Sequence, residues 1–231
     1  MLRLSLLLSL FLFSAQSHAL LFIEPFAQVE IGGAEQDYTN QGTGEKRTRD
    51  YSTTYTGFGA RGGVTFNHFY LGARVSRSTG KWDEGTDREH SDTLNTNLFN
   101  QNNPLVEREA SRVTFGPMVG VKFGSKALFR MWASYLKSSL EHKVKLDGSD
   151  VKKLKGTGFT FGVGLAPARY FSLNLEMQGL WYSEENDKKF HYDETSAGDT
   201  YRVAAQSEFG FLFSISIPIG LLYPKGGGGG D

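Results

Sequence analysis

Apolar and polar side chains alternate along much of the chain, most clearly near the C-terminus. From Glu208 to Leu221 every odd position is apolar, and the even positions are mostly small or polar. A period of two places successive side chains on opposite faces of a β-strand. The pattern recurs and predicts eight strands, over residues 23–32, 55–66, 69–77, 112–123, 127–140, 158–165, 171–182 and 208–221.

The connections between these segments alternate in length. Short connections cover residues 67–68, 124–126 and 166–169, whereas long polar ones cover 33–52, 79–110, 144–152 and 183–202. Short periplasmic turns and long extracellular loops are typical of outer-membrane barrels. The sequence therefore predicts an all-β fold, an eight-stranded antiparallel up-and-down transmembrane β-barrel with both termini periplasmic.

The bulk of the apolar side chains indicates which face points outward. Twelve phenylalanines lie on the apolar face: Phe58, Phe66, Phe69, Phe115, Phe123, Phe129, Phe159, Phe161, Phe171, Phe209, Phe211 and Phe213. The interior of an eight-stranded barrel is only wide enough for ordinary side chains, so these rings would overfill it. The opposite face carries glycines and charges, which suit a narrow polar lumen. This volume argument disfavours a soluble, lipocalin-like barrel with its apolar face inside.

The two ends of the chain differ from its body. Residues 1–19 combine a basic start, an apolar run over Leu4–Phe13, and small residues at Ser17 and Ala19, which together predict a cleaved secretory signal peptide. Residues 20–223 then form the barrel domain, and residues 224–231 a flexible glycine-rich tail.

Composition narrows the function classes. The chain has 25 basic and 25 acidic residues and no cysteine. No net field attracts nucleic acid, and a disulfide scaffold or thiol nucleophile is excluded. The signal peptide, eight alternating strands, short turns and long loops resemble the small eight-stranded outer-membrane barrels of Gram-negative bacteria, of the outer-membrane protein A type or the opacity type. The resemblance implies an outer-membrane location, contact with membrane lipids and lipopolysaccharide, and assembly by the barrel-insertion machinery.

Charged residues on the polar face are the most specific feature. The predicted lumen network comprises Glu30, Arg61, Arg74, Arg130, Glu176 and Glu208. A two-residue turn at Asn67-His68 would place Arg61 opposite Arg74, and like charges facing each other destabilise a sheet. We therefore expect Glu176, Glu30 or both to pair with these arginines. One interpretation is a salt-bridged plug, and the alternative is the charged constriction of a small pore.

Three further expectations concern single residues. Aromatic girdles are expected at the outer ends of the strands (Tyr51, Trp82, Trp181, Tyr182) and at the inner ends (Phe22, Phe66, Phe69, Phe123, Phe171, Tyr223). Pro117 lies within a strand and is expected to mark a bulge. The histidines at positions 68, 90, 142 and 191 are expected to be solvated, because no catalytic arrangement surrounds them in the sequence.

The sequence therefore predicts a non-enzymatic outer-membrane protein with a structural or surface-interaction role, through loops that bind a surface ligand. A small porin-like channel is the alternative, and a lipid-modifying or proteolytic outer-membrane enzyme comes third. No catalytic residue, cofactor, metal site or nucleic-acid partner is expected.

Overall fold

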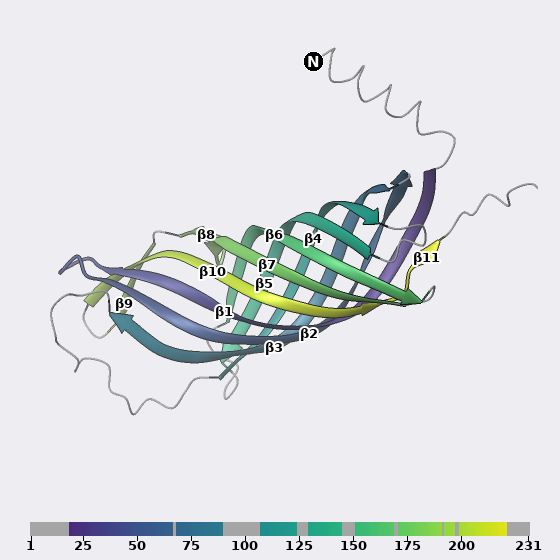
Figure 1. The fold of residues 1–231 in the computed structure, drawn as a ribbon. Coiled ribbons are helices and arrows are strands. Elements are labelled where there is room, and N and C mark those ends of the chain that lie inside the picture. Colours follow the sequence, from purple (N-terminus) through teal and green to yellow (C-terminus); the bar gives the residue numbers. More distant parts are fainter. Residues whose placement is uncertain are drawn as a thin grey trace, which may run out of the picture.

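The fold is a closed barrel of long antiparallel strands (Figure 1). The structure is a computed structural model that describes residues 19–66, 68–89, 107–123, 129–144, 151–168, 171–190, 192–196 and 199–220. The barrel strands are β1 (Ala19–Asn40), β2 (Lys46–Phe66), β3 (Phe69–Glu89), β4 (Glu107–Phe123), β5 (Phe129–Val144), β6 (Lys152–Ala168), β7 (Phe171–Glu185) and β10 (Asp199–Ser216). Three short strands accompany them: β8 (Lys188–Lys189), β9 (Tyr192–Ser196) and β11 (Ile219–Gly220). No helix among the described residues is long and apolar enough to cross a membrane.

Pairing between the first and last long strands closes the sheet. β1 pairs with β2 on one side and with β10 on the other, so every long strand has two neighbours. Cross-strand partners followed once around the barrel from Glu24 lead back to β1 at Ala34, ten residues further along. This stagger tilts the strands, as closure of a twisted sheet requires. The predicted fold class is confirmed.

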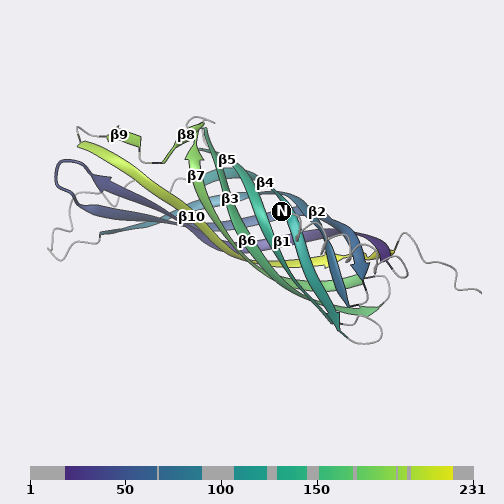
Figure 2. The same cartoon turned by 90° about the horizontal axis from the view of Figure 1, so that it is seen from above.

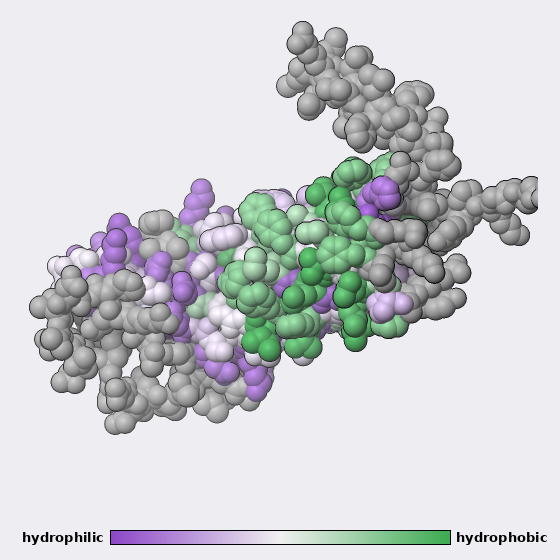
Figure 3. All heavy atoms as spheres, in the orientation of Figure 1, coloured by the Kyte–Doolittle hydropathy of each residue, from purple (hydrophilic) through white to green (hydrophobic). Residues whose placement is uncertain are grey.

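The apolar face points outward. The side chains of Phe209, Phe211 and Phe213 are 48%, 47% and 55% exposed, which agrees with a surface that lies against lipid. Figure 3 shows the apolar residues gathered around one part of the barrel, beside a more polar part at the far end of the long strands. Because successive side chains point to opposite faces of a strand, the residues that alternate with the apolar ones face the lumen.

Several strands are longer than the pattern predicts. β1 and β2 continue through most of the expected loop 33–52, and only residues 41–45 connect them. The side-chain oxygen of Asn40 accepts hydrogen bonds from the amides of Gly42 (2.8 Å) and Thr43 (3.2 Å), and Gly44 takes a positive φ of 73°. This hairpin closes a polar part of the β1–β2 sheet. Alternation of apolar residues does not reveal strands whose two faces are both polar.

The elongated strands form an extension on one side of the barrel. β1, β2, β3 and β10 run on beyond the ends of β4–β7, and β9 pairs with β10 there (Figures 1 and 2). Pairing of β1 with β2 continues to Thr39 and Lys46. The expected loops 79–110 and 183–202 are likewise partly strand, although residues 90–106 lie outside the described residues.

One local prediction is wrong. Pro117 marks no bulge: the pairing of β4 with β5 keeps one register on both sides of it, from Phe115 opposite Lys137 to Met118 opposite Ser134. Proline removes a single donor from the ladder, and the neighbouring pairs hold the strand in place. The signal peptide falls almost wholly outside the described residues, and the glycine-rich tail and Tyr223 lie entirely outside them.

Candidate functional site in the barrel lumen

The six predicted charged residues all face the lumen. Glu30, Arg61, Arg74, Glu176 and Glu208 are at most 3% exposed, and Arg130 is 8% exposed. β2 pairs with β3 so that Phe66 lies opposite Phe69 and Arg61 opposite Arg74. Arginines that face each other this closely require carboxylates between them.

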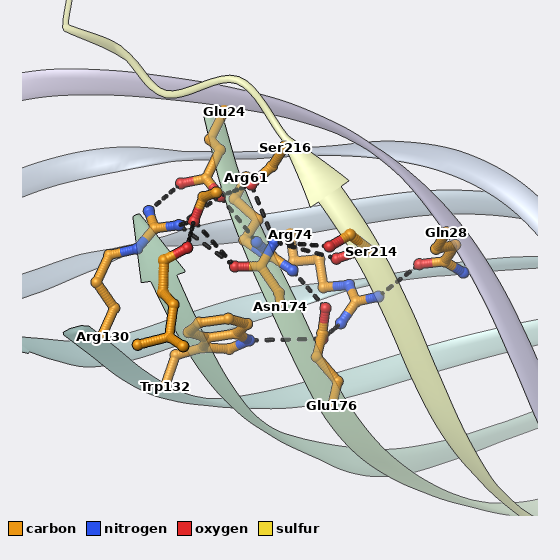
Figure 4. Close-up of polar contacts among 12 residues, drawn as sticks. Glu24, Gln28, Arg61, Arg74, Arg130, Trp132, Asn174, Glu176, Ser214 and Ser216 are labelled. Atoms are coloured by element: carbon orange, nitrogen blue, oxygen red, sulfur yellow. Dashed lines mark hydrogen bonds and ion pairs between the residues drawn. The ribbon is translucent and has the colours of Figure 1, made fainter. Parts of the chain in front are cut away.

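Glu176 meets that requirement (Figure 4). One of its carboxylate oxygens accepts a hydrogen bond from Arg61 and the other from Arg74, so a single carboxylate bridges two guanidinium groups. Arg74 also donates to Gln28 Oε1 at 2.9 Å. Arg61 donates to Glu24 Oε1 at 3.0 Å, and Arg130 donates to the other oxygen of the same carboxylate. These residues form one continuous network across the barrel, the inner network.

A second network lies further from the termini. Arg112 pairs with Glu30 and, at 2.8 Å, with Glu208. The hydroxyl of Tyr182 donates to Glu208 at 2.8 Å. Glu30 therefore belongs to this outer network and does not pair with Arg61 or Arg74, for which it was one of the expected partners.

Two residues of these networks were not included in the network predicted from the sequence, although both lie on the polar, lumen-facing side of their strands. Glu24 is the cross-strand neighbour of Arg61, and Arg112 reaches Glu30 across the lumen. Alternation shows which face a residue is on but not what stands opposite. The register of β1 against β2 was missing for Glu24, and the contact across the lumen was missing for Arg112. With both included, four arginines oppose four glutamates: Arg61, Arg74, Arg112 and Arg130 against Glu24, Glu30, Glu176 and Glu208.

Aromatic rings enclose the arginines. The guanidinium carbon of Arg61 lies 4.6 Å from the ring centre of Phe26 and 4.3 Å from that of Trp132. Such contacts suit arginine because its planar cation stacks on ring faces. Glycines make room for the rings, since a Cβ at Gly162 would lie 2.2 Å from the Trp132 ring, and one at Gly59 2.5 Å from Phe26.

The outer part of the lumen contains a buried apolar cluster. Its members are Ala34, Tyr51, Tyr55, Trp82, Ala110, Leu136, Leu140, Leu154, Leu180, Tyr182, Phe190 and Val203. The expected outer girdle is therefore wrong for Tyr51, Trp82 and Tyr182, and among its four members only Trp181, 55% exposed, faces outward. In the inner girdle, Phe22 also turns inward and packs against the buried rings of Tyr70 and Trp132.

His142 corrects another expectation. It is 4% exposed inside the barrel, and its ring stacks on Trp82 with centres 4.9 Å apart. The strand β5 is longer than predicted, which carries this histidine into the lumen rather than into a solvated loop. Among the described residues, no group of three or more histidine, cysteine or acidic side chains is placed to hold a metal ion.

A small cavity lies beside the inner network. The cavity beside Glu24, Arg61, Lys122 and Arg130 has a volume of about 10 Å³. A water molecule needs roughly that much room. The lumen in the described part of the chain holds a crossed set of ion pairs, with packed rings at its outer end.

The chain is similar to several solved structures at low sequence identity. Three of them are Neisserial surface protein A (11% identity, TM-score 0.40, covering 84% of this chain and 96% of that one), the attachment invasion locus protein Ail of Yersinia pestis with the heparin analogue sucrose octasulfate (8%, 0.41, 84% and 99%), and OprG of Pseudomonas aeruginosa (9%, 0.44, 87% and 95%). The outer membrane protease OmpT of Escherichia coli also matches (8%, 0.41, 86% and 97%).

No curated protein sequence matches the chain. The family model described as the outer membrane protein beta-barrel domain matches residues 5–202. The chain is an integral outer-membrane barrel protein and belongs to the outer membrane protein β-barrel family.

Proposed function

We propose that the protein is a closed, non-enzymatic scaffold of the outer membrane that holds a polar β-sheet at the cell surface. The filled lumen is the observation that carries this proposal. Glu176 bridges Arg61 and Arg74 across the barrel, and the apolar cluster around Trp82 and Leu140 closes the outer end. Ion pairs buried between aromatic rings favour a fixed plug over a conducting constriction.

The extension supports a role at the surface. A transmembrane β-strand needs about 9–11 residues. The strands of the extension are much longer, and β1 has 22 residues. The side chains of Asp37 and Thr48 face outward across its first hairpin and are joined by a 2.8 Å hydrogen bond. A polar, ordered sheet outside the membrane is suited to contact a large extracellular partner, such as matrix or another cell.

The proposal includes an orientation, with the extension outside the cell and both termini in the periplasm. Because the chain lacks cysteine, single cysteines report it cleanly. We expect Gln41→Cys at the hairpin tip to react with a membrane-impermeant maleimide on intact cells. His68→Cys, in the short turn at the other end, reacts only after the outer membrane is permeabilised. Labelling of His68→Cys alone on intact cells contradicts the orientation.

A shortened variant tests the surface role. Gln36 and Arg49 are cross-strand partners, so residues 37–48 can be replaced by the two-residue turn Asn-Gly without changing the register below them. We expect the variant to insert and remain heat-modifiable on a gel, while the cells lose adhesion to wells coated with collagen, fibronectin or heparin. Equal adhesion of the wild type, the shortened variant and cells without the protein contradicts this role.

A further inference from the structure

Two basic side chains occur on the lipid-facing surface among apolar neighbours. Arg77 of β3 and Lys137 of β5 are exposed and share their faces with the outward-pointing Val75 and Tyr135. The cross-strand neighbours of Arg77 are Phe58 and Val113. Those of Lys137 are Phe115 and Thr157. Both cations therefore lie at the edge of the apolar band rather than in the polar extension.

The register places the two cations at the same depth. Only β4 lies between their strands, and it presents Val113 and Phe115 between them. Cross-strand partners followed once around the eight strands shift by ten residues toward the extension, which is a little over one residue per strand. Cross-strand pairing leads from Arg77 through Val113 to Ser139 on β5. Over these two strands the shift places Ser139 about two residues further out than Arg77. Lys137, two residues before Ser139, therefore lies at the depth of Arg77.

These cations differ from their neighbours in having no anionic partner. Lys143 and Lys153, on the same side but further out, pair with Glu109 at 3.6 Å and Glu141 at 3.7 Å. Within the described part of the chain, neither Arg77 nor Lys137 has a carboxylate within ion-pair distance. A lipid-facing cation costs roughly 2–4 kcal/mol at the bilayer midplane and about 0–1 near the interface, so both side chains must reach a polar layer.

We propose that Arg77 and Lys137 bind the phosphate groups of a phosphorylated lipid in the outer leaflet, with Val113 and Phe115 against its acyl chains. Neighbouring strands lie about 4.8 Å apart, so the two Cα atoms are roughly 10–12 Å apart and the long side chains converge on one headgroup. Arginine forms paired hydrogen bonds with phosphate, and lysine adds a flexible point charge.

Native mass spectrometry of the refolded full chain with diphosphorylated lipid A tests this site. We expect the wild type to bind one lipid A molecule and the double variant Arg77→Gln/Lys137→Gln to bind about tenfold more weakly, as expected for lost hydrogen bonds to charged groups. The charge-preserving exchange Arg77→Lys/Lys137→Arg retains binding. The matched control Lys143→Gln/Lys153→Gln, which also removes two outward cations, binds as the wild type does.

Two results overturn the proposal. One is equal binding of lipid A by the wild type and the Arg77/Lys137 double variant, with both shown to be folded by heat-modifiability. The other is displacement of lipid A by inorganic phosphate at an equal concentration, which would assign the cations to a free anion instead of a lipid. Failure of phosphate to compete even in large excess supports the lipid as the source.

Discussion

Removal of the Glu176 charge is the most informative perturbation of the lumen. Glu176→Gln preserves the size of the side chain but takes the shared carboxylate from Arg61 and Arg74, both of which are at most 2% exposed. Arg61 keeps Glu24 as an anionic partner, whereas Arg74 keeps its hydrogen bond to the neutral Gln28 and its contact with the Phe26 ring. The two networks then contain four arginines and three glutamates.

The size of the effect follows from this burial. Loss of one partner of a buried ion pair lowers the free energy of unfolding by roughly 3–5 kcal/mol. The remaining Gln28 contact argues for the lower end, about 3 kcal/mol. At about 2–4 °C per kcal/mol for a chain of this size, the unfolding midpoint falls by roughly 6–12 °C. The measurement is the temperature at which the folded band is lost on a gel, combined with urea unfolding of the refolded protein.

A double-mutant cycle separates the charge pair from general damage. Arg74→Gln/Glu176→Gln restores the charge balance, so we expect it to lose less stability than the two single variants together, with a coupling of about 1–3 kcal/mol. Glu109→Gln is the control, because its pair with Lys143 is about half exposed and contributes about 0–1 kcal/mol. If the double variant loses as much as the two singles summed, the network does not hold the barrel together.

Two further predictions concern the packing of the lumen and the direction of the tryptophans. Gly162→Ala forces a Cβ against the Trp132 ring and is expected to lower the free energy of unfolding, measured in urea, by about 1–3 kcal/mol. The control Gly62→Ala faces outward, its Cβ has its nearest contact at 3.5 Å, and its free energy of unfolding should stay within about 0.5 kcal/mol of the wild type. Equal effects of the two variants contradict the packing of Trp132. Brominated lipids should quench tryptophan fluorescence mainly through Trp181, which faces outward, whereas Trp82 and Trp132 are buried in the lumen. Trp181→Phe is therefore expected to abolish most of the quenching, and Trp82→Phe and Trp132→Phe to leave it. Quenching that survives in Trp181→Phe contradicts the burial of Trp82 and Trp132.

The sequence predicts the barrel well because alternation and bulk report directly on lipid and lumen. Phe209, Phe211 and Phe213 repeat at every second position, and twelve rings cannot fit inside eight strands. The facing arginines were also predictable, because a two-residue turn fixes the register between Arg61 and Arg74. Elsewhere the register depends on loops of unequal length, so the sequence left both Glu176 and Glu30 as possible partners of these arginines, and the structure pairs Glu176 with them.

The outer half of the molecule was less predictable for a different reason. Above the apolar band both faces of a strand can be polar, so β1 and β2 continue to Asn40 and Lys46 without the alternation that would reveal them. Trp82 and Tyr182 fit an interfacial girdle by their position in the chain. Both side chains point inward. For Tyr182 this follows from the face that it shares with Glu176 and Gln178 in the predicted strand 171–182, whereas for Trp82 it becomes visible only when the strand is followed beyond the band.

Steady conductance in planar lipid bilayers tests the closed lumen most directly. Refolded wild-type protein is expected to produce no steady channel, because the ion pairs of the two networks cross the lumen and the packed rings of the apolar cluster lie at its outer end. Arg74→Gln/Glu176→Gln, which loosens the inner network, provides the comparison. A steady wild-type conductance that changes in this variant would show that ions pass through the network, and the closed scaffold would be contradicted.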